Sequence, residues 1–215
     1  GGTTTAQAVL TGLGLSVANF ISGSSKNPPV WIKRELVQKG LCASSLGESP
    51  SPKRLIAAVG DPFQSVATGL LLGAREAGQP VLLGGGGQML AVLALTLEAV
   101  HPSLRKNLVE GVSLVTTAWL ADEVSITGGE KPAFEYLLNI VEQHFDVRLL
   151  GMSSGLRFNS STHKELRDYE LGYVKEGVGA GALTLLAQLN GISCKKLVDA
   201  CDVAINQLRM NSDQE

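Results

Sequence analysis

The segment from Pro80 to Val100 restricts the possible folds of this chain more than any other. Pro80-Val81-Leu82-Leu83 is a short apolar run that predicts a buried strand, and four glycines follow it. The next residues, from about Gln88 to Val100, are apolar enough for a buried helix and too few to span a bilayer. A strand, a glycine loop and a helix in this order are typical of an α/β protein.

The same alternation continues along the chain. We predict a second strand from Val112 to Trp119, a helix from Pro132 to Phe145 and a third strand from Val147 to Leu150. Strands that alternate with helices imply a parallel sheet with right-handed crossovers. The predicted fold class is therefore α/β, a doubly wound and mostly parallel sheet with flanking helices, with its ligand at the carboxyl ends of the strands.

Helical patterns occupy both sides of this region. The helices predicted before it are Thr3–Ile21, one that begins at Pro28-Pro29 and stops at Gly40, and one from Pro62 to Ala77 capped by Asp61. A polar loop from Gly151 to His163 is followed by predicted helices at Asp168–Tyr173, Val178–Leu189 and Ser193–Met210. We accordingly divide the chain into an α/β nucleotide-binding core, residues 1–167, and a helical C-terminal appendage, residues 168–215.

The beginning of the chain and its cysteines bear on its origin. A helix that starts at a glycine pair resembles the second half of a strand–loop–helix unit, so we expect N-terminal sequence to precede Gly1. The residues before the first apolar stretch carry no positive charge, unlike a secretory signal. Cys42, Cys194 and Cys201 have no metal-ligand spacing, which fits free thiols in the cytoplasm. We expect Cys194 and Cys201, seven residues apart in a helical pattern, to be small core residues rather than reactive groups.

Charge and motifs exclude several classes of function. With 18 basic and 20 acidic side chains the net charge is -2, so we expect neither nucleic acid nor membrane as a partner. The sequence lacks the G-x-x-x-x-G-K-[ST] motif of P-loop enzymes, and its three histidines have no partners spaced for a metal site or a hydrolase triad. No G-x-G-x-x-G follows a predicted strand, which leaves an NAD-dependent oxidoreductase as a minor alternative.

Three glycine-rich stretches stand at predicted helix starts: Gly1-Gly2-Thr3-Thr4-Thr5, Gly84-Gly85-Gly86-Gly87 and Gly177-Val178-Gly179-Ala180-Gly181. Backbone N–H groups without side-chain obstruction, at the positive end of a helix dipole, favour a phosphate. Each stretch alone is equally explained by a tight turn or by close helix packing. Three in one α/β chain favour a phosphorylated ligand.

Two charged residues are candidates for roles in phosphate binding or catalysis. Lys33, one turn into its helix, can point back to a phosphate, or it can be a solvated lysine beside Arg34. Glu176, between Lys175 and Gly177 at a helix entry, can be a structural acid stabilised by the dipole. Partly desolvated against an aromatic ligand, its carboxylate would have a raised pKa and could act as a general base.

Taken in order, these segments resemble the nicotinate-nucleotide:dimethylbenzimidazole phosphoribosyltransferases of cobalamin assembly, and more closely an archaeal and cyanobacterial branch related to them. The segments are Gly1 to Ala6, Gly23-Ser24-Ser25 with Lys33 downstream, Asp61-Pro62, Pro80 to Gly85, and Lys175 to Ala180. The last is the most specific, because the family carries its catalytic glutamate in a similar Gly-Glu-Gly-Thr-Gly-Ala motif.

The resemblance implies transfer of phosphoribose from nicotinate mononucleotide to a base, with Glu176 as the catalytic residue and no cofactor or metal. It implies that phosphate and substrate are held by Gly1, Gly2, Thr3, Thr4, Lys33, Gly84, Gly85, Gly177, Val178 and Gly179, and that the protein is a homodimer. Gly84, Lys175 and Val178 differ from the family pattern, so the acceptor is left open between a benzimidazole-like base and a purine. A non-catalytic nucleotide-binding homologue is the alternative.

Overall fold

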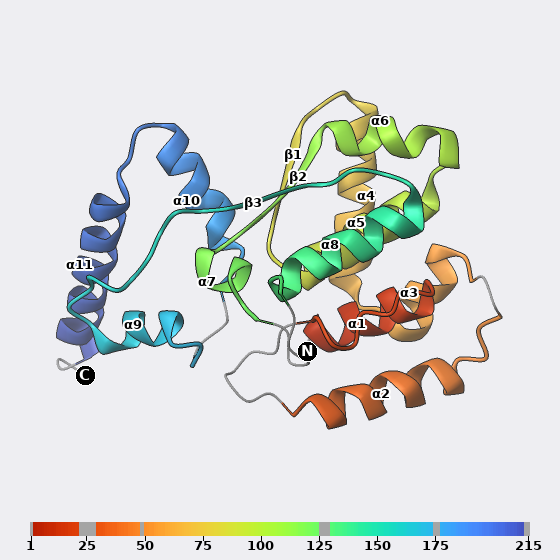
Figure 1. The fold of residues 1–215 in the computed structure, drawn as a ribbon, viewed down its shortest axis with the longest axis horizontal. Helices are drawn as coiled ribbons and strands as arrows, with labels where there is room; N and C mark the ends of the chain where they lie inside the picture. The colour runs from red at the N-terminus through yellow and green to blue at the C-terminus, as the bar shows by residue number, and fades with distance from the viewer. Residues whose placement is uncertain (1, 22–28, 48–49, 125–129, 174–176, 213–215) are drawn as a thin grey trace.

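A computed structural model describes residues 2–21, 29–47, 50–124, 130–173 and 177–212 (Figure 1). The elements in chain order are α1 (Gly2–Gly12), α2 (Val30–Ala43), α3 (Pro52–Val59), α4 (Pro62–Glu76), β1 (Val81–Gly84), α5 (Gly87–Ala99), the 3-10 helix η1 (Pro102–Leu104), α6 (Arg105–Glu110), β2 (Val112–Thr116), α7 (Ala118–Ala121), α8 (Ala133–Phe145), β3 (Leu150–Ser153), α9 (Lys164–Glu170), α10 (Ala180–Leu189) and α11 (Cys194–Ser212).

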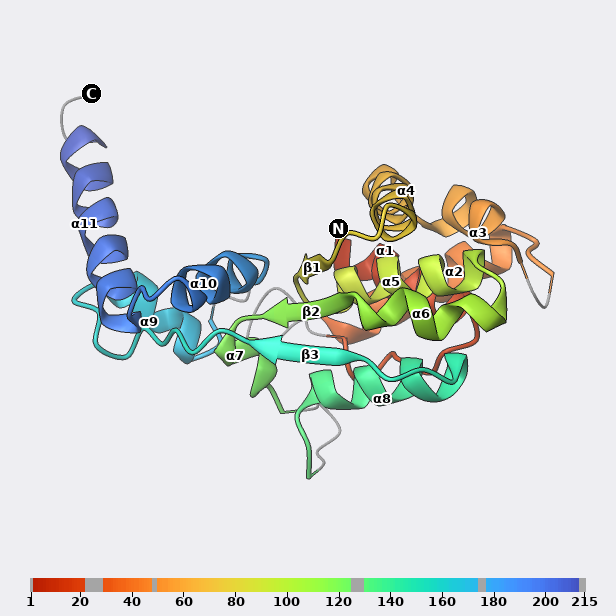
Figure 2. The ribbon, with the colours of Figure 1, turned by 90° about the horizontal axis from the view of Figure 1, so that it is seen from above.

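The three strands form one parallel sheet in the order β1-β2-β3. Leu82 pairs with Ser113, which pairs in turn with Leu150, so these three residues form one row across the sheet. All three strands end on the same side, where α9, α10 and α11 lie (Figure 2). The predicted α/β class, with a parallel sheet, flanking helices and a helical C-terminus, is confirmed. The described strands follow one another without the reversal of order that creates a switch point in doubly wound sheets.

One face of the sheet packs on helices α5 and α8. The row formed by Leu83, Leu114 and Gly151 points to this side: both leucines belong to the main core, and a Cβ at Gly151 would lie 2.6 Å from Cδ1 of Leu138 in α8. Helices α1 and α4 pack on α5 in turn. Because α5 is surrounded by other elements, its residues from Leu90 to Leu97 are buried on every side. This explains a helix that is apolar all round.

Several predicted boundaries are confirmed, and local capping explains the start of α4. Asp61 begins α4 with a capping box, in which its Oδ1 accepts a hydrogen bond from the N–H of Gln64 at 2.9 Å and the Gln64 side chain accepts from the N–H of Asp61 at 3.1 Å. Pro62 occupies the first helical turn, as expected from its fixed φ. The strand at Val81 and the helices α5 and α8 also begin within one residue of the prediction.

Other predicted boundaries are wrong. The first helix ends at Gly12 rather than Ile21, because Gly14 turns the chain with a φ of 87°. Helix α2 passes through Gly40 and ends at Ala43.

Three predicted boundaries later in the chain are also wrong. The second strand ends at Thr116, since α7 begins two residues later, and the third strand is displaced to Leu150–Ser153. Helix α9 begins at Lys164 rather than Asp168. The division that we drew between residues 167 and 168 therefore lies within this helix. A second, smaller hydrophobic cluster packs residues from both sides of that point, including Phe158, Leu166 and Val198.

Candidate functional site

The start of α10 packs on the carboxyl ends of β1 and β2 through glycines. A Cβ at Gly84 would lie 2.9 Å from the carbonyl oxygen of Gly179, and a Cβ at Gly179 would lie 3.0 Å from the carbonyl oxygen of Gly84. A Cβ at Gly181 would lie 2.3 Å from the carbonyl carbon of Thr116. Close packing is therefore a sufficient reason for glycine at these three positions, and it brings two of the glycine stretches together.

The first glycine stretch joins the same region from α1. A Cβ at Gly2 would lie 2.4 Å from Nε2 of Gln88, in the first turn of α5. The starts of α1 and α5 are thus adjacent, and the Gly84–Gly87 stretch lies between them and α10. Thr3 and Thr4 are half-buried in the first turn of α1, and Gly1 lies outside the described residues. The structure consequently brings three glycine stretches, far apart in sequence, to one end of the sheet; we call this region the glycine junction.

Asp61 ties α1 to α4 near this region. Its Oδ2 accepts a hydrogen bond from Oγ1 of Thr5 at 2.5 Å, while its Oδ1 caps α4. The carbonyl oxygen of Gly2, 3.0 Å from Oγ1 of Thr5, is the alternative acceptor for the single hydrogen of this hydroxyl. The Asp61-Pro62 pair therefore positions the beginning of α1 as well as starting its own helix.

Buried hydroxyl groups lie where β2 and β3 end. Thr116, Thr117 and Ser154 are at most 2% exposed, and their side-chain oxygens have no hydrogen-bond partner in the described part of the chain. A buried hydroxyl without a partner costs about 1–3 kcal/mol, so such groups normally meet water, a ligand or further protein. The carboxyl end of the sheet is therefore polar and incompletely satisfied.

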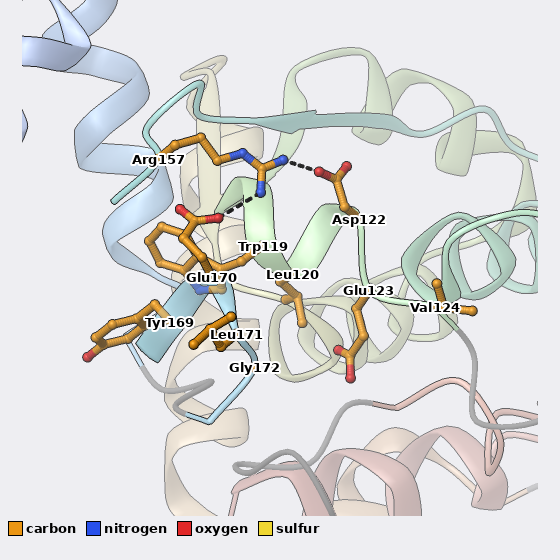
Figure 3. Close-up of a pocket in the computed structure, with 10 residues that line it drawn as sticks. All are labelled: Trp119, Leu120, Asp122, Glu123, Val124, Arg157, Tyr169, Glu170, Leu171 and Gly172. Atoms are coloured by element: carbon orange, nitrogen blue, oxygen red, sulfur yellow. Dashed lines mark hydrogen bonds and ion pairs between the residues drawn. The ribbon is translucent and has the colours of Figure 1, made fainter. Parts of the chain in front are cut away.

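A cavity of about 520 Å³ adjoins the glycine junction (Figure 3). Leu120 connects the two, because it lines the cavity and its Cδ2 would lie 2.6 Å from a Cβ at Gly86. The lining comes from α7 and the residues after it, from Arg157, and from the end of α9: Trp119, Leu120, Asp122, Glu123, Val124, Arg157, Tyr169, Glu170, Leu171 and Gly172. Its volume is that of a small-molecule site.

Arg157 holds one wall of the cavity together. Its guanidinium donates to Glu170 at 3.0 Å and also to Asp122, as Figure 3 shows. Burial lowers the pKa of Arg157, but the two carboxylates outweigh it, and the pKa is raised overall. Glu170 also accepts a hydrogen bond from the N–H of Phe158 at 2.7 Å. These bonds fix α9 to the segment that follows β3.

Aromatic rings form the inner part of this wall. Trp119 stacks on Phe158 with ring centroids 5.4 Å apart and lies at 5.4 Å from Tyr169. One buried polar atom of the lining, Nε1 of Trp119, makes no hydrogen bond in the described part of the chain. The cavity thus offers a donor and flat apolar surfaces, which suits a heteroaromatic ring.

Lys33 is half-buried in α2, whereas Arg34 is exposed and bonds to Asn19. Burial lowers the pKa of Lys33, and the negative charge of Glu123 raises it in part. Because Glu123 lines the cavity, this electrostatic interaction connects Lys33 with the cavity wall. A fully solvated lysine does not fit this environment.

The glutamate motif is described only in part. Glu176 lies outside the described residues, as does Lys175. Gly177 has a φ of 69°, a left-handed conformation that favours glycine, and nothing would contact a Cβ there. Val178 is half-buried one residue before Gly179. On the other side of the motif, Gly172 lines the cavity.

Sequence reasoning missed the cavity. One sequence feature could have indicated it: the acidic pair Asp122-Glu123 follows shortly after a predicted strand, and the carboxyl ends of parallel strands form ligand sites. Arg157 and Glu170 gave no signal, because their pairing joins a loop to a helix 13 residues later. Among the described residues, no group of three or more His, Cys, Asp or Glu could hold a metal ion. None of the helices in the described part is long and apolar enough to cross a membrane.

The structure is that of an α/β protein with a parallel sheet and a cavity of about 520 Å³ near the carboxyl ends of its strands. No family model matches the chain. The chain is 64% identical over 208 residues to a UPF0284 protein of Prochlorococcus marinus strain MIT 9313 and 55% identical over 208 residues to one of Parasynechococcus marenigrum strain WH8102. It is 43% identical over 191 residues to a UPF0284 protein of Cyanothece sp. strain PCC 7425.

These alignments cover 97%, 97% and 88% of this chain but 52%, 52% and 48% of the respective relatives. The chain is therefore homologous to cyanobacterial UPF0284 proteins and spans about half the length of the curated relatives it matches.

Proposed function

We propose that the full-length protein containing this chain is a phosphoribosyltransferase that moves phosphoribose from nicotinate mononucleotide to a benzimidazole-like or purine base. The observation that carries the proposal is the glycine junction: three glycine stretches, distant in sequence, meet at the carboxyl ends of a parallel sheet beside a cavity of about 520 Å³. A phosphate and an aromatic base are the two parts of a nucleotide that such a pair of sites would hold.

The phosphate would lie at the glycine junction. Neither Gly86, the N-cap of α5, nor Gly179, the N-cap of α10, provides a side-chain cap. The first N–H groups of both helices are therefore not occupied by a capping side chain, and both helix dipoles place partial positive charge there. The buried hydroxyls of Thr116 and Thr117 would add donors at the same end of the sheet.

The acceptor base would enter the cavity. Its ring would lie against Trp119 or Tyr169, which leaves its two ring nitrogens available for the reaction. The cavity carries more carboxylates than cations, which favours a neutral or protonated heterocycle over an anionic one. The cavity is therefore less suited to nicotinate, which is an anion, than to the acceptor base.

The reaction needs one proton transfer and one displacement. A ring nitrogen of the base attacks the anomeric carbon, and the C–N bond to nicotinate breaks with its electron pair going to the nicotinate nitrogen. Glu176 accepts the proton from the other ring nitrogen of the base, so the product base is neutral. The leaving group is already a pyridinium and requires no acid, and fixing the phosphate aligns the sugar for attack from the opposite face.

The test uses the purified full-length protein with nicotinate mononucleotide and either dimethylbenzimidazole or adenine, with nicotinate and the new nucleotide measured by mass spectrometry. Glu176→Gln should lose at least about 100-fold in turnover while still binding the mononucleotide, since general-base catalysis contributes about that much. Glu110→Gln is the matched control, because Glu110 is exposed at the end of α6. Unchanged turnover in Glu176→Gln would refute the role given to this residue.

Binding measurements beside this assay distinguish the alternative functions. Binding of nicotinate mononucleotide by calorimetry, with no product from any base, would identify a non-catalytic nucleotide-binding protein. Tight binding of intact NAD in place of the mononucleotide would instead favour an oxidoreductase.

A further inference from the structure

One face of the sheet is uncovered along its amino-terminal half. The row Leu82–Ser113–Leu150 points away from α5 and α8, because its residues alternate with the buried row of Leu83 and Leu114. Leu82 is 38% exposed and Leu150 is 55% exposed, whereas Leu83 and Leu114 on the opposite face are 7% and 0% exposed. Apolar side chains therefore face outward from a parallel sheet.

Helix α10 covers only the other half of this face. It contacts all three strands, and a Cβ at Gly84 would lie 2.9 Å from the Cβ of Ala182, one row beyond Leu82. Val115, in the row of Gly84, is completely buried. The next residue of α10, Leu183, is 72% exposed. Figure 2 shows α10 lying at the carboxyl ends of the strands.

Sheet topology explains why the described chain leaves this face bare. The strands follow one another in the order β1-β2-β3, and both crossovers are right-handed by rule, so their helices α5 and α8 lie on the same face. Parallel sheets are nevertheless buried on both faces, since their strands carry apolar residues on both. A second layer is therefore required, and it must come from outside the described chain.

We infer that the row Leu82–Ser113–Leu150, together with Leu183, is the docking surface for an apolar helix from the part of the full-length protein that lies outside this chain. The relatives supply the length: the 208 aligned residues are 52% of the first relative, which leaves nearly as many residues to form the missing layer. Such a helix would complete an α/β sandwich with helices on both faces.

The size of the surface favours a segment of the same polypeptide over a second copy. A stable interface between separate molecules takes about 20–30 residues on each side. Four side chains fall far short of this, but a tethered helix docks at a high effective concentration and needs less surface. The half-buried Ser113 in the middle of the row would sit against the helix backbone or a small side chain.

Thiol labelling of the full-length protein tests this inference. Leu150→Cys is made in a protein whose Cys42, Cys194 and Cys201 are replaced by serine, and Leu36→Cys is the matched control. Leu36 is also 55% exposed, but it lies on α2, in the helical layer remote from the sheet. We expect maleimide to label Leu150→Cys at least about 100-fold more slowly in the native protein than in urea, because labelling would require the docked helix to open.

Protection that persists when a monomeric sample is diluted supports docking of a helix from the same polypeptide. Labelling of Leu150→Cys within about tenfold of its rate in urea, while Leu36→Cys reports that the reagent reaches the folded protein, would overturn the inference. Protection that disappears on dilution would identify a second copy as the occupant and would overturn it equally. Ser113→Cys, which is nearly isosteric, repeats the test in the same row if Leu150→Cys fails to fold.

Discussion

Replacing Gly181 with alanine tests the packing at the glycine junction. The new Cβ would stand 2.3 Å from the carbonyl carbon of Thr116, where carbon atoms normally approach to about 3.5 Å. The start of α10 would have to move by roughly 1 Å, because the obstacle is backbone and cannot rotate away. Overpacking of this kind costs about 1–3 kcal/mol, and the better helix propensity of alanine offsets about 1 kcal/mol at most. Taking the middle of that range, about 2 kcal/mol, less about 1 kcal/mol, we expect a net loss of about 1 kcal/mol.

Gly69→Ala is the matched control for this change. Gly69 also lies in a helix, α4, but no atom lies within 4 Å of the position its Cβ would take. Only the propensity gain acts there, so the free energy of unfolding should rise by up to about 1 kcal/mol. Both variants of the 215-residue chain would be unfolded in urea and followed by circular dichroism. The two midpoints should move in opposite directions, with unchanged slopes.

Equal or reversed shifts would refute the close approach of α10 to β2. A neutral Gly181→Ala would mean that the helix start has room for a methyl group, and the glycines at Gly84 and Gly179 would then need another explanation. In that case, ligand contact rather than packing would account for them.

Two further predictions concern the links between elements. Asp61→Ala should lower the free energy of unfolding by at least about 1 kcal/mol, whereas Asp61→Asn, which keeps a capping oxygen, should lower it less; urea midpoints of both variants decide this. Hydrogen bonds from Ser161 and Thr162 lower the pKa of Asp202, so its stabilising effect is complete above the unfolded pKa of about 3.9 and is lost as the pH falls through the folded value. The urea midpoint should therefore fall between about pH 5 and pH 2 by more in the natural chain than in Asp202→Asn, and equal falls would contradict this assignment.

The parts of the fold that could be predicted from sequence are those set by local chemistry. Asp61 and Pro62 fix the start of α4, and the apolar run at Val81 followed by glycines fixes β1 and α5. The α/β class follows from this alternation. The end of β2 and the position of β3 could not be predicted in the same way, because pairing with neighbouring strands, rather than composition, determines where those strands lie.

The candidate site divides along the same line. Glycine stretches are visible in the sequence, but that Gly84 approaches Gly179 depends on how α10 returns to the sheet. The ion pair between Arg157 and Glu170, which holds one wall of the cavity together, forms only when the tertiary structure brings the two residues into contact. The role of Glu176, which lies outside the described residues, stays a prediction.

The complete burial of α5 has a consequence for how the molecule opens. Because α1, α4 and α8 all contact α5, no small excursion can expose its amides to solvent, and they should exchange hydrogen only through global unfolding. At the other extreme, Val198 is the one buried apolar residue on the described part of α11, so we expect that helix to detach at a small free energy. Opening free energies should therefore decrease from the centre of the helical layer towards the C-terminal helix, and the cavity, whose wall includes α9, lies in the part that opens first.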